Sequence, residues 1–262
     1  SRTLAPDVRY NQETAAEVGA TISISSSEAT LIYRDLSGQP GVYETDSSLV
    51  IRPETAYRLT VNTTRGETLT ATTTTPARFA VDEWVLLDST GSTVLRRLKT
   101  FAEAGDSVYY QPENQLVYAE GLLEARFTSG GAGVFSALGY QLALFSIDPD
   151  SDYVIDPPFF EDEDFEDLPR QGSSPILSSL DGFVRLPWFG IFFEGRYNYK
   201  VFAVDQNWFD VVRTTPQAGG GLGFGGNAGD GVEDPLFRVE GGIGLFGSAS
   251  VDSVGFYILS QE

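Results

Sequence analysis

The chain contains no histidine, no cysteine and no methionine among its 262 residues. Without cysteine there are no disulfides, no thiolate nucleophiles and no zinc–thiolate sites. Without histidine the chain lacks the commonest general base, the Ser-His-Asp triad and the commonest transition-metal ligand. The sequence therefore predicts a protein that is not an enzyme, although a pair of carboxylates is enough to hydrolyse a glycoside and keeps that chemistry open.

Positive charge is also scarce, since 17 lysine and arginine side chains stand against 37 aspartate and glutamate side chains and the net charge is −20. Nucleic acids and anionic lipid surfaces are bound through a positive footprint. We therefore expect no nucleic-acid partner and no docking on a membrane by charge. An acidic surface keeps a protein soluble, and it is also compatible with cation binding.

Long hydrophobic runs are missing, because no stretch approaches the roughly 18 apolar residues that a membrane-spanning helix needs. Residues 1–10 do not form a signal peptide, and the chain has no initiator methionine. We expect a processed or partial chain, with any targeting segment upstream of Ser1. Hydrophobic residues still make up 41% of the chain and aromatic residues 13%, which favours a folded protein over a disordered one.

The first third of the chain alternates polar and apolar residues with a period of two. Residues 21–25 and 56–61 are the clearest examples, and such alternation predicts strands with one buried face. Further strands are expected at 29–33, 48–51 and 67–75. No helical period lies between them, so residues 1–78 predict an N-terminal antiparallel sandwich of immunoglobulin or transthyretin type.

Residues 79–262 predict a larger, less regular antiparallel β-sandwich. Tyr197 to Val204 alternates with apolar residues on both faces, so we expect this strand inside a two-layer stack. Only residues 93–103 and 206–214 look helical. The other expected strands are 78–87, 108–110, 121–127, 140–147, 236–240 and 251–259. The predicted fold class is therefore all-β, in two modules divided near residue 78.

Two segments of the C-terminal module predict loops from their composition. Residues 157–175 include the acidic run 161–167, which we interpret as a solvated loop in preference to a metal cage. Residues 217–231 are mostly glycine, which is typical of a flexible connection. A loop that folds over a partner is the alternative for the glycine tract.

The segment from Gly242 to Gly247 matches G-x-G-x-x-G, the pattern of a dinucleotide-binding turn. That turn needs a helix after it and a second parallel strand. Only 15 residues follow, and they are strand-like. We therefore interpret the glycines as a tight crossing or bulge between two late strands, and we expect no cofactor.

Asp148, Asp150 and Asp152 alternate in the segment Asp-Pro-Asp-Ser-Asp, which resembles the opening of a calcium loop. The rest of the EF-hand pattern fails, because Tyr153 stands where glycine is needed and Phe159 where the bidentate glutamate should be. The three aspartates are the candidate metal ligands of this sequence. The interpretation that we favour is a solvated acidic turn capped by its own side chains.

Trp84, Trp188 and Trp208 could stack on sugars, and together with a carboxylate pair they would suit a carbohydrate-binding or glycoside-cleaving domain. In an all-β chain, tryptophans more often belong to the core. With 37 acidic residues the sequence does not single out a pair of carboxylates.

One resemblance covers most of the chain and rests on the order and spacing of short motifs. The segments that carry it are 19–24, 40–43, 51–61, 73–76, 197–210 and 239–248. In these the chain resembles a family of Bacteroidota-type outer-membrane lipoproteins known as a domain of unknown function. Members are often encoded beside TonB-dependent receptors, and the resemblance implies an exported accessory lipoprotein at the cell surface. It implies no catalytic residues, and it places the lipid-bearing cysteine and the first half of the first long strand upstream of Ser1.

The leading hypothesis is therefore a non-enzymatic outer-membrane surface protein that binds a partner receptor or its ligand, and that reaches the membrane only through a lipid anchor. The alternative is a structural subunit of an extracellular filament or surface layer, a homo-oligomer assembled by adding a strand to a neighbour's open sheet edge.

Overall fold

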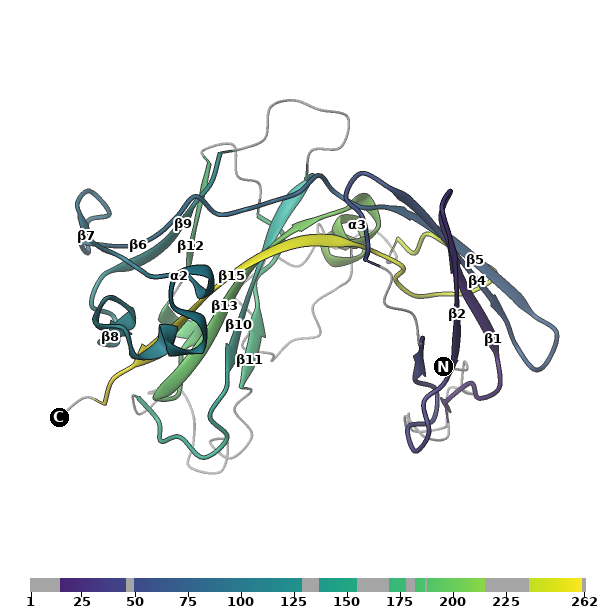
Figure 1. Cartoon of the computed structure of the whole chain (residues 1–262), viewed down its shortest axis with the longest axis horizontal. Helices are drawn as coiled ribbons and strands as arrows, with labels where there is room; N and C mark the ends of the chain where they lie inside the picture. Colours follow the sequence, from purple (N-terminus) through teal and green to yellow (C-terminus); the bar gives the residue numbers. More distant parts are fainter. Residues whose placement is uncertain are drawn as a thin grey trace.

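The computed structural model describes residues 15–45, 50–128, 137–154, 170–177, 182–186, 188–214 and 236–260. The described strands form three sheets of six, five and four strands, which we call the first, second and third sheets. All strand pairs are antiparallel except that of β15 with β8. Figure 1 shows the first sheet on one side of an arch and the other two sheets on the other side. The all-β prediction is confirmed.

The first sheet has the strand order β14-β5-β4-β1-β2-β3. Its strands are β1 (Thr21–Ser25), β2 (Thr30–Asp35), β3 (Tyr43–Glu44), β4 (Ala56–Asn62), β5 (Thr68–Thr74) and β14 (Val239–Glu240). Because Ile24 lies opposite both Leu31 and Leu59, the period of two gathers apolar side chains on one face. The opposite face carries mainly serine and threonine, as the alternation predicts.

The second and third sheets stack on each other as a β-sandwich. The second sheet, in order, is β11 (Gln171–Ser173), β10 (Gly139–Ser146), β13 (Gly195–Val204), β15 (Ala249–Ile258) and β8 (Gln115–Leu116). The third, in order, is β12 (Phe183–Leu186), β9 (Leu122–Arg126), β6 (Glu83–Leu87) and β7 (Val94–Arg97). Strand β13 lies between β10 and β15 inside the stack, as its apolar residues on both faces predict.

The hydrophobic core lies between these two sheets. Trp84 of β6 is 1% exposed, and its ring meets the ring of Tyr199 of β13 edge-on at 5.1 Å. The main cluster of buried apolar side chains begins at Val81, and none of its described members comes from β1 to β5. The sandwich therefore holds the main core, and the first sheet is attached to it.

The predicted division at residue 78 stays a prediction, but one strand pair crosses it. Strand β14 comes from the C-terminal part of the chain, yet Val239 lies opposite Ala71 and Glu240 opposite Thr70 in the first sheet. The chain then passes through residues 241–247 to β15. A Cβ on Gly241 would lie 2.5 Å from the Thr68 backbone oxygen, so this glycine lets the connection between the late strands β14 and β15 pass close to β5.

Two short α-helices are described, α2 (Phe101–Ala104) and α3 (Gln206–Thr214). The helical expectation for 206–214 is correct, whereas the expectation for 93–103 is wrong for 94–97, which form β7 because they pair with β6. The strand expected at 108–110 is a 3₁₀ helix, Gly105–Tyr110. Its residues Val108 and Tyr109 pack on Gly255, where a Cβ would lie 2.7 Å from both side chains. No helix of the described ranges is long and apolar enough to cross a membrane.

Several expectations fall on residues outside the described ranges. These include the acidic run 161–167, the glycine tract 217–231 and part of the strand expected at 48–51. Within the loop expected at 157–175, residues 171–173 form β11, so that part of the expectation is wrong. Strand pairing with β10 uses backbone groups, and Gln-Gly-Ser can therefore form an edge strand without an apolar face.

Candidate binding surfaces

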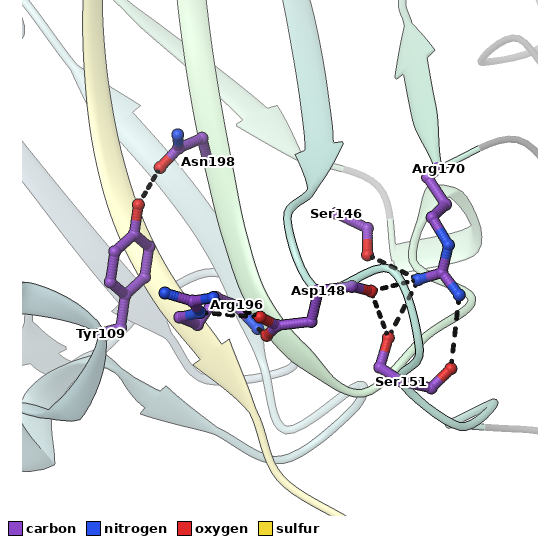
Figure 2. A network of polar contacts seen from close by, with 7 residues as sticks. All are labelled: Tyr109, Ser146, Asp148, Ser151, Arg170, Arg196 and Asn198. Carbon is purple, nitrogen blue, oxygen red and sulfur yellow. Dashed lines mark hydrogen bonds and ion pairs between the residues drawn. The ribbon is translucent and has the colours of Figure 1, made fainter.

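The turn after β10 carries the three predicted calcium ligands, and Figure 2 shows its surroundings. The Asp148 carboxylate accepts hydrogen bonds from the backbone N–H of Arg196 at 2.7 Å, from its Nε at 2.8 Å and from its Nη2 at 2.5 Å. Arg170 donates to the backbone oxygen of Asp148 at 2.6 Å and to Ser151 Oγ at 3.0 Å. The Asp148 carboxylate therefore already forms an ion pair with the Arg196 guanidinium.

The other two aspartates, Asp150 and Asp152, are exposed. The described residues contain no group of three acidic side chains arranged to hold a metal ion. The structure thus does not bring the three candidate ligands together, and calcium binding stays a prediction. The hydrogen bonds from Arg196 hold the pKa of the Asp148 carboxyl below its usual range, and the charges of Arg196 and Arg170 act in the same direction.

Replacing Asp148 with asparagine is expected to lower the free energy of unfolding near pH 7 by about 1–2 kcal/mol. Because the folded-state pKa is depressed, this contribution is present above the unfolded-state pKa of about 4 and is lost as the pH falls through the folded-state value. Urea unfolding of the wild type and Asp148→Asn, near pH 7 and at low pH, measures the difference. Exposed Asp150→Asn is the control, and a difference for Asp148→Asn that is constant with pH would contradict the assignment.

A second polar cluster lies on the outer face of the third sheet, in a pocket of about 470 Å³ lined by residues 82–83, 91, 124, 126–128, 182–183 and 185. Glu124 is 3% exposed and lies opposite Arg185 in the sheet. Each of its carboxylate oxygens accepts a hydrogen bond from one guanidinium, from Arg126 Nε and from Arg185 Nε, both at 2.7 Å. With Asp82 and Glu83 also present, three negative groups face two positive ones, and the pocket has no strong preference for an ion of either sign.

Replacing Glu124 with glutamine is expected to lower the free energy of unfolding by about 2 kcal/mol, because it leaves two guanidinium groups without their shared counter-charge. Both arginine side chains are more than a third exposed, so water offsets part of the loss. Glu83→Gln is the matched control, since Glu83 is half exposed and 3.9 Å from Arg126. Its expected effect is below about 0.5 kcal/mol. Equal losses in the two variants by urea unfolding would refute this role for Glu124.

Helix α3 joins the sandwich to the first sheet, beginning at a single buried carboxylate. Asp205 is 7% exposed and accepts a hydrogen bond from the backbone N–H of Trp208 at 2.9 Å, which caps the helix. Its other oxygen accepts hydrogen bonds from Thr73 Oγ1 of β5 and from Ser248 Oγ, which precedes β15. Asp205 therefore connects the first sheet, the helix and the start of β15.

Two further side chains of α3 extend this connection. Asn207 donates through Nδ2 to the backbone oxygens of Thr72 and Phe246, each at 2.7 Å. Trp208 donates from Nε1 to Gln141 Oε1 of β10 at 2.8 Å. We call the contacts of Asp205, Asn207 and Trp208 the α3 junction. They hold the first sheet and the second sheet in one arrangement.

The C-terminal half of α3 contacts the segment that leads into β14. Asp210 is 3% exposed and forms an ion pair with Arg238 Nη2 at 2.5 Å. Thr214 Oγ1 accepts a hydrogen bond from the backbone N–H of Leu236 at 2.8 Å. These contacts position the segment that leads into β14 and from there to β15.

A groove of about 380 Å³ lies beside the start of β15, lined by residues 50–53, 75–76, 78 and 249–250. Val50 is 77% exposed and Ile51 is 53% exposed, and Val251, one residue beyond the lining, is 50% exposed. Exposed apolar side chains gathered in this way mark contact sites for other molecules. We call this feature the β15 groove.

The sequence alone gives little indication of these surfaces. Val50 and Ile51 belong to a segment expected to be a strand, but they lie in no strand, which leaves both apolar side chains exposed. Of the three tryptophans, Trp84 is buried in the core, and Trp188 donates its ring N–H to the Gly121 backbone oxygen. Trp208 belongs to the α3 junction, so each of the three tryptophans takes part in the packing or hydrogen bonding of the fold.

Comparison with known proteins yields no relative: a scan against models of protein families, a search of curated proteins and a search of solved structures each found no match. The resemblance to outer-membrane lipoproteins therefore stays a prediction that rests on the sequence motifs.

Proposed function

We propose that this chain is a non-enzymatic binding protein of the bacterial cell surface, an accessory lipoprotein that docks on an outer-membrane receptor or captures that receptor's ligand. The observation that carries the proposal is the β15 groove, in which exposed Val50 and Ile51 lie beside the start of β15. The family resemblance supports the cell-surface location. In this proposal the outer membrane is reached through a lipid anchor.

The α3 junction supports a binding role because it gives the groove a fixed shape. Residues 50–53 and 75–76 belong to the part of the chain that builds the first sheet, and 249–250 begin β15 of the second sheet. Hydrogen bonds from α3 to Thr72 of β5 and to Gln141 of β10 fix these two parts relative to each other. A preformed surface loses less conformational entropy when it binds, which favours affinity.

The test is co-purification of the tagged mature protein from native outer membranes. We expect one outer-membrane protein to co-purify in near-stoichiometric amount, and we expect Val50→Glu to abolish this because it places a charge in the groove. Ile32→Glu is the matched control, since Ile32 is 49% exposed on the serine- and threonine-rich face of the first sheet. The absence of any co-purifying outer-membrane protein with the wild type would contradict the proposal.

A structural subunit that assembles by strand addition is the second candidate, and an open backbone edge on β15 favours it. The two candidates differ in oligomeric state. Filament assembly requires the mature protein to self-associate as its concentration rises, so a monodisperse monomer at high concentration in light scattering would exclude it.

A further inference from the structure

Strand β15 has a paired edge and an open edge. In an antiparallel pair, alternate residues point both backbone groups toward the partner and the residues between them point both groups away. Two backbone groups near the end of β15 point away from β13. The Gly255 oxygen accepts a hydrogen bond from Asn114 Nδ2 at 2.6 Å, and the N–H of Leu259, one residue after the strand, donates to the Leu116 oxygen at 2.9 Å. By the same alternation, Ala249, Val251 and Ser253 also point away from β13.

This edge is covered at one end of β15 and open at the other. Strand β8 pairs with β15 only at Tyr257 and Ile258. Along Ala249 to Ser253 no other described strand pairs with that side, and the Ser253 N–H is taken by the neighbouring Asp252 carboxylate at 2.7 Å. The chain before β6 contacts the same stretch through side chains only, because the Phe79 N–H donates to Ser250 Oγ at 2.9 Å and the Val81 N–H to Asp252 Oδ2 at 2.8 Å. In Figure 1 this open part is the beginning of the yellow strand, near α3. An extended chain added here would continue the second sheet in the position that β8 occupies further along.

The open edge and the β15 groove are one surface, because Ala249 and Ser250 line the groove. An added strand directs alternate side chains to opposite faces of the sheet. Side chains on the face toward the groove would therefore meet the exposed apolar groups of Val50 and Ile51. The groove thus favours apolar residues at alternate positions of the added strand.

The charge of the groove is opposite to that of the protein. Arg52 and Arg78 line it, in a chain whose net charge is −20. Arg52 is paired with Glu28 at 3.1 Å, whereas Arg78 is exposed and forms no ion pair with any described residue. An uncompensated guanidinium beside an apolar groove suits a carboxylate on the incoming segment.

We propose that Ala249–Ser253 of β15 is a strand-addition site for an extended segment of a partner protein, one that alternates apolar residues with at least one carboxylate. The backbone ladder supplies affinity, and the apolar groove with Arg78 supplies specificity. This inference rests on the proposed function, since it names the surface and the kind of partner through which the protein docks.

The test uses the full chain and two fluorescent peptides, acetyl-GVEVEVG-amide and acetyl-GVKVKVG-amide, in fluorescence anisotropy near physiological salt. We expect the glutamate peptide to bind about tenfold more tightly than the lysine peptide. A protein with a net charge of −20 would favour the lysine peptide if only its overall field acted. Preference for the lysine peptide, or no binding of either, would overturn the proposal.

Two variants, each with a matched control variant, separate the contribution of the charge from that of the backbone hydrogen bonds. Arg78→Glu is expected to weaken the glutamate peptide about tenfold, while Arg58→Glu, on the serine- and threonine-rich face of the first sheet, leaves it unchanged. Val251→Pro removes an N–H of the open edge, where proline is tolerated, and is expected to abolish binding, whereas Val251→Ala keeps the N–H and most of the affinity. Unchanged binding to Val251→Pro would overturn strand addition.

A peptide methylated on its alternate backbone nitrogens tests the backbone hydrogen bonds to β15 by removing the peptide's own donors, and this test needs no protein variant. We expect it not to bind, and equal binding of the methylated and unmethylated peptides would overturn the proposal. Failure of strand addition can be told apart from failure of the proposed receptor binding, because the two are measured in different experiments. If the receptor still co-purifies with Arg78→Glu and Val251→Pro, the protein binds a receptor through another surface.

Discussion

Replacing Asp205 with alanine is expected to lower the free energy of unfolding by about 2–3 kcal/mol and to loosen the first sheet from the sandwich. The carboxylate is 7% exposed and accepts hydrogen bonds from Thr73, Ser248 and the N–H of Trp208. Loss of a helix N-cap costs about 1 kcal/mol. Each buried donor left unpaired adds about 1 kcal/mol or more, and the Thr73 hydroxyl retains only its contact with Ser248.

The measurement is native-state amide hydrogen exchange combined with urea unfolding. Exchange in β5 should accelerate far more than exchange in β13, because the sandwich core does not depend on Asp205. Asp205→Asn is the matched control, since asparagine also caps helices well, and it should lose about half as much stability. Equal acceleration of exchange in β5 and β13 would mean that the α3 junction is not the tie between the sheets.

Replacing Trp84 with alanine is expected to lower the free energy of unfolding by about 3–5 kcal/mol, the usual range for a large aromatic residue removed from a core. Trp84 is 1% exposed, and its ring packs edge-on against Tyr199 at 5.1 Å. The cavity lies between the second and third sheets, where rigid strands on both sides limit its collapse. This is the largest single-residue effect that we predict.

Urea unfolding followed by circular dichroism checks this value, with Trp84→Phe as a variant that retains an aromatic ring and should lose less. Leu95→Ala is the surface control, since Leu95 is 50% exposed on the edge strand β7, and its effect should stay below about 0.5 kcal/mol. A loss below about 1 kcal/mol for Trp84→Ala would show that the core does not lie where the two sheets meet.

The local parts of the fold were predictable from the sequence. Tyr197 to Val204 alternates over its whole length, and β13 is the central strand that this pattern predicts. The helix at 206–214 follows Asp205, which caps it. The 3₁₀ helix at 105–110 differs from the predicted strand, and the residue on which it packs, Gly255, is far away in the sequence.

The contacts that build the surfaces could not be predicted, because they join distant segments. Asp148 was identified as a possible metal ligand from its neighbours in sequence, but its partner Arg196 lies 48 residues away. Glu124 lies within a predicted strand, and its partner Arg185 comes from another strand 61 residues further along the chain. The β15 groove combines three separate segments, and no local pattern encodes their meeting.

Site-specific photo-cross-linking at Val251, in the cells that make the protein, tests the central claim most directly. Because Val251 lies on the open edge of β15 and is 50% exposed, a photoreactive residue there should cross-link to one surface protein of the outer membrane. The same residue placed at Leu95 on β7 should not. Cross-links from Leu95 alone, or from Val251 only to a second copy of this chain, would contradict the account.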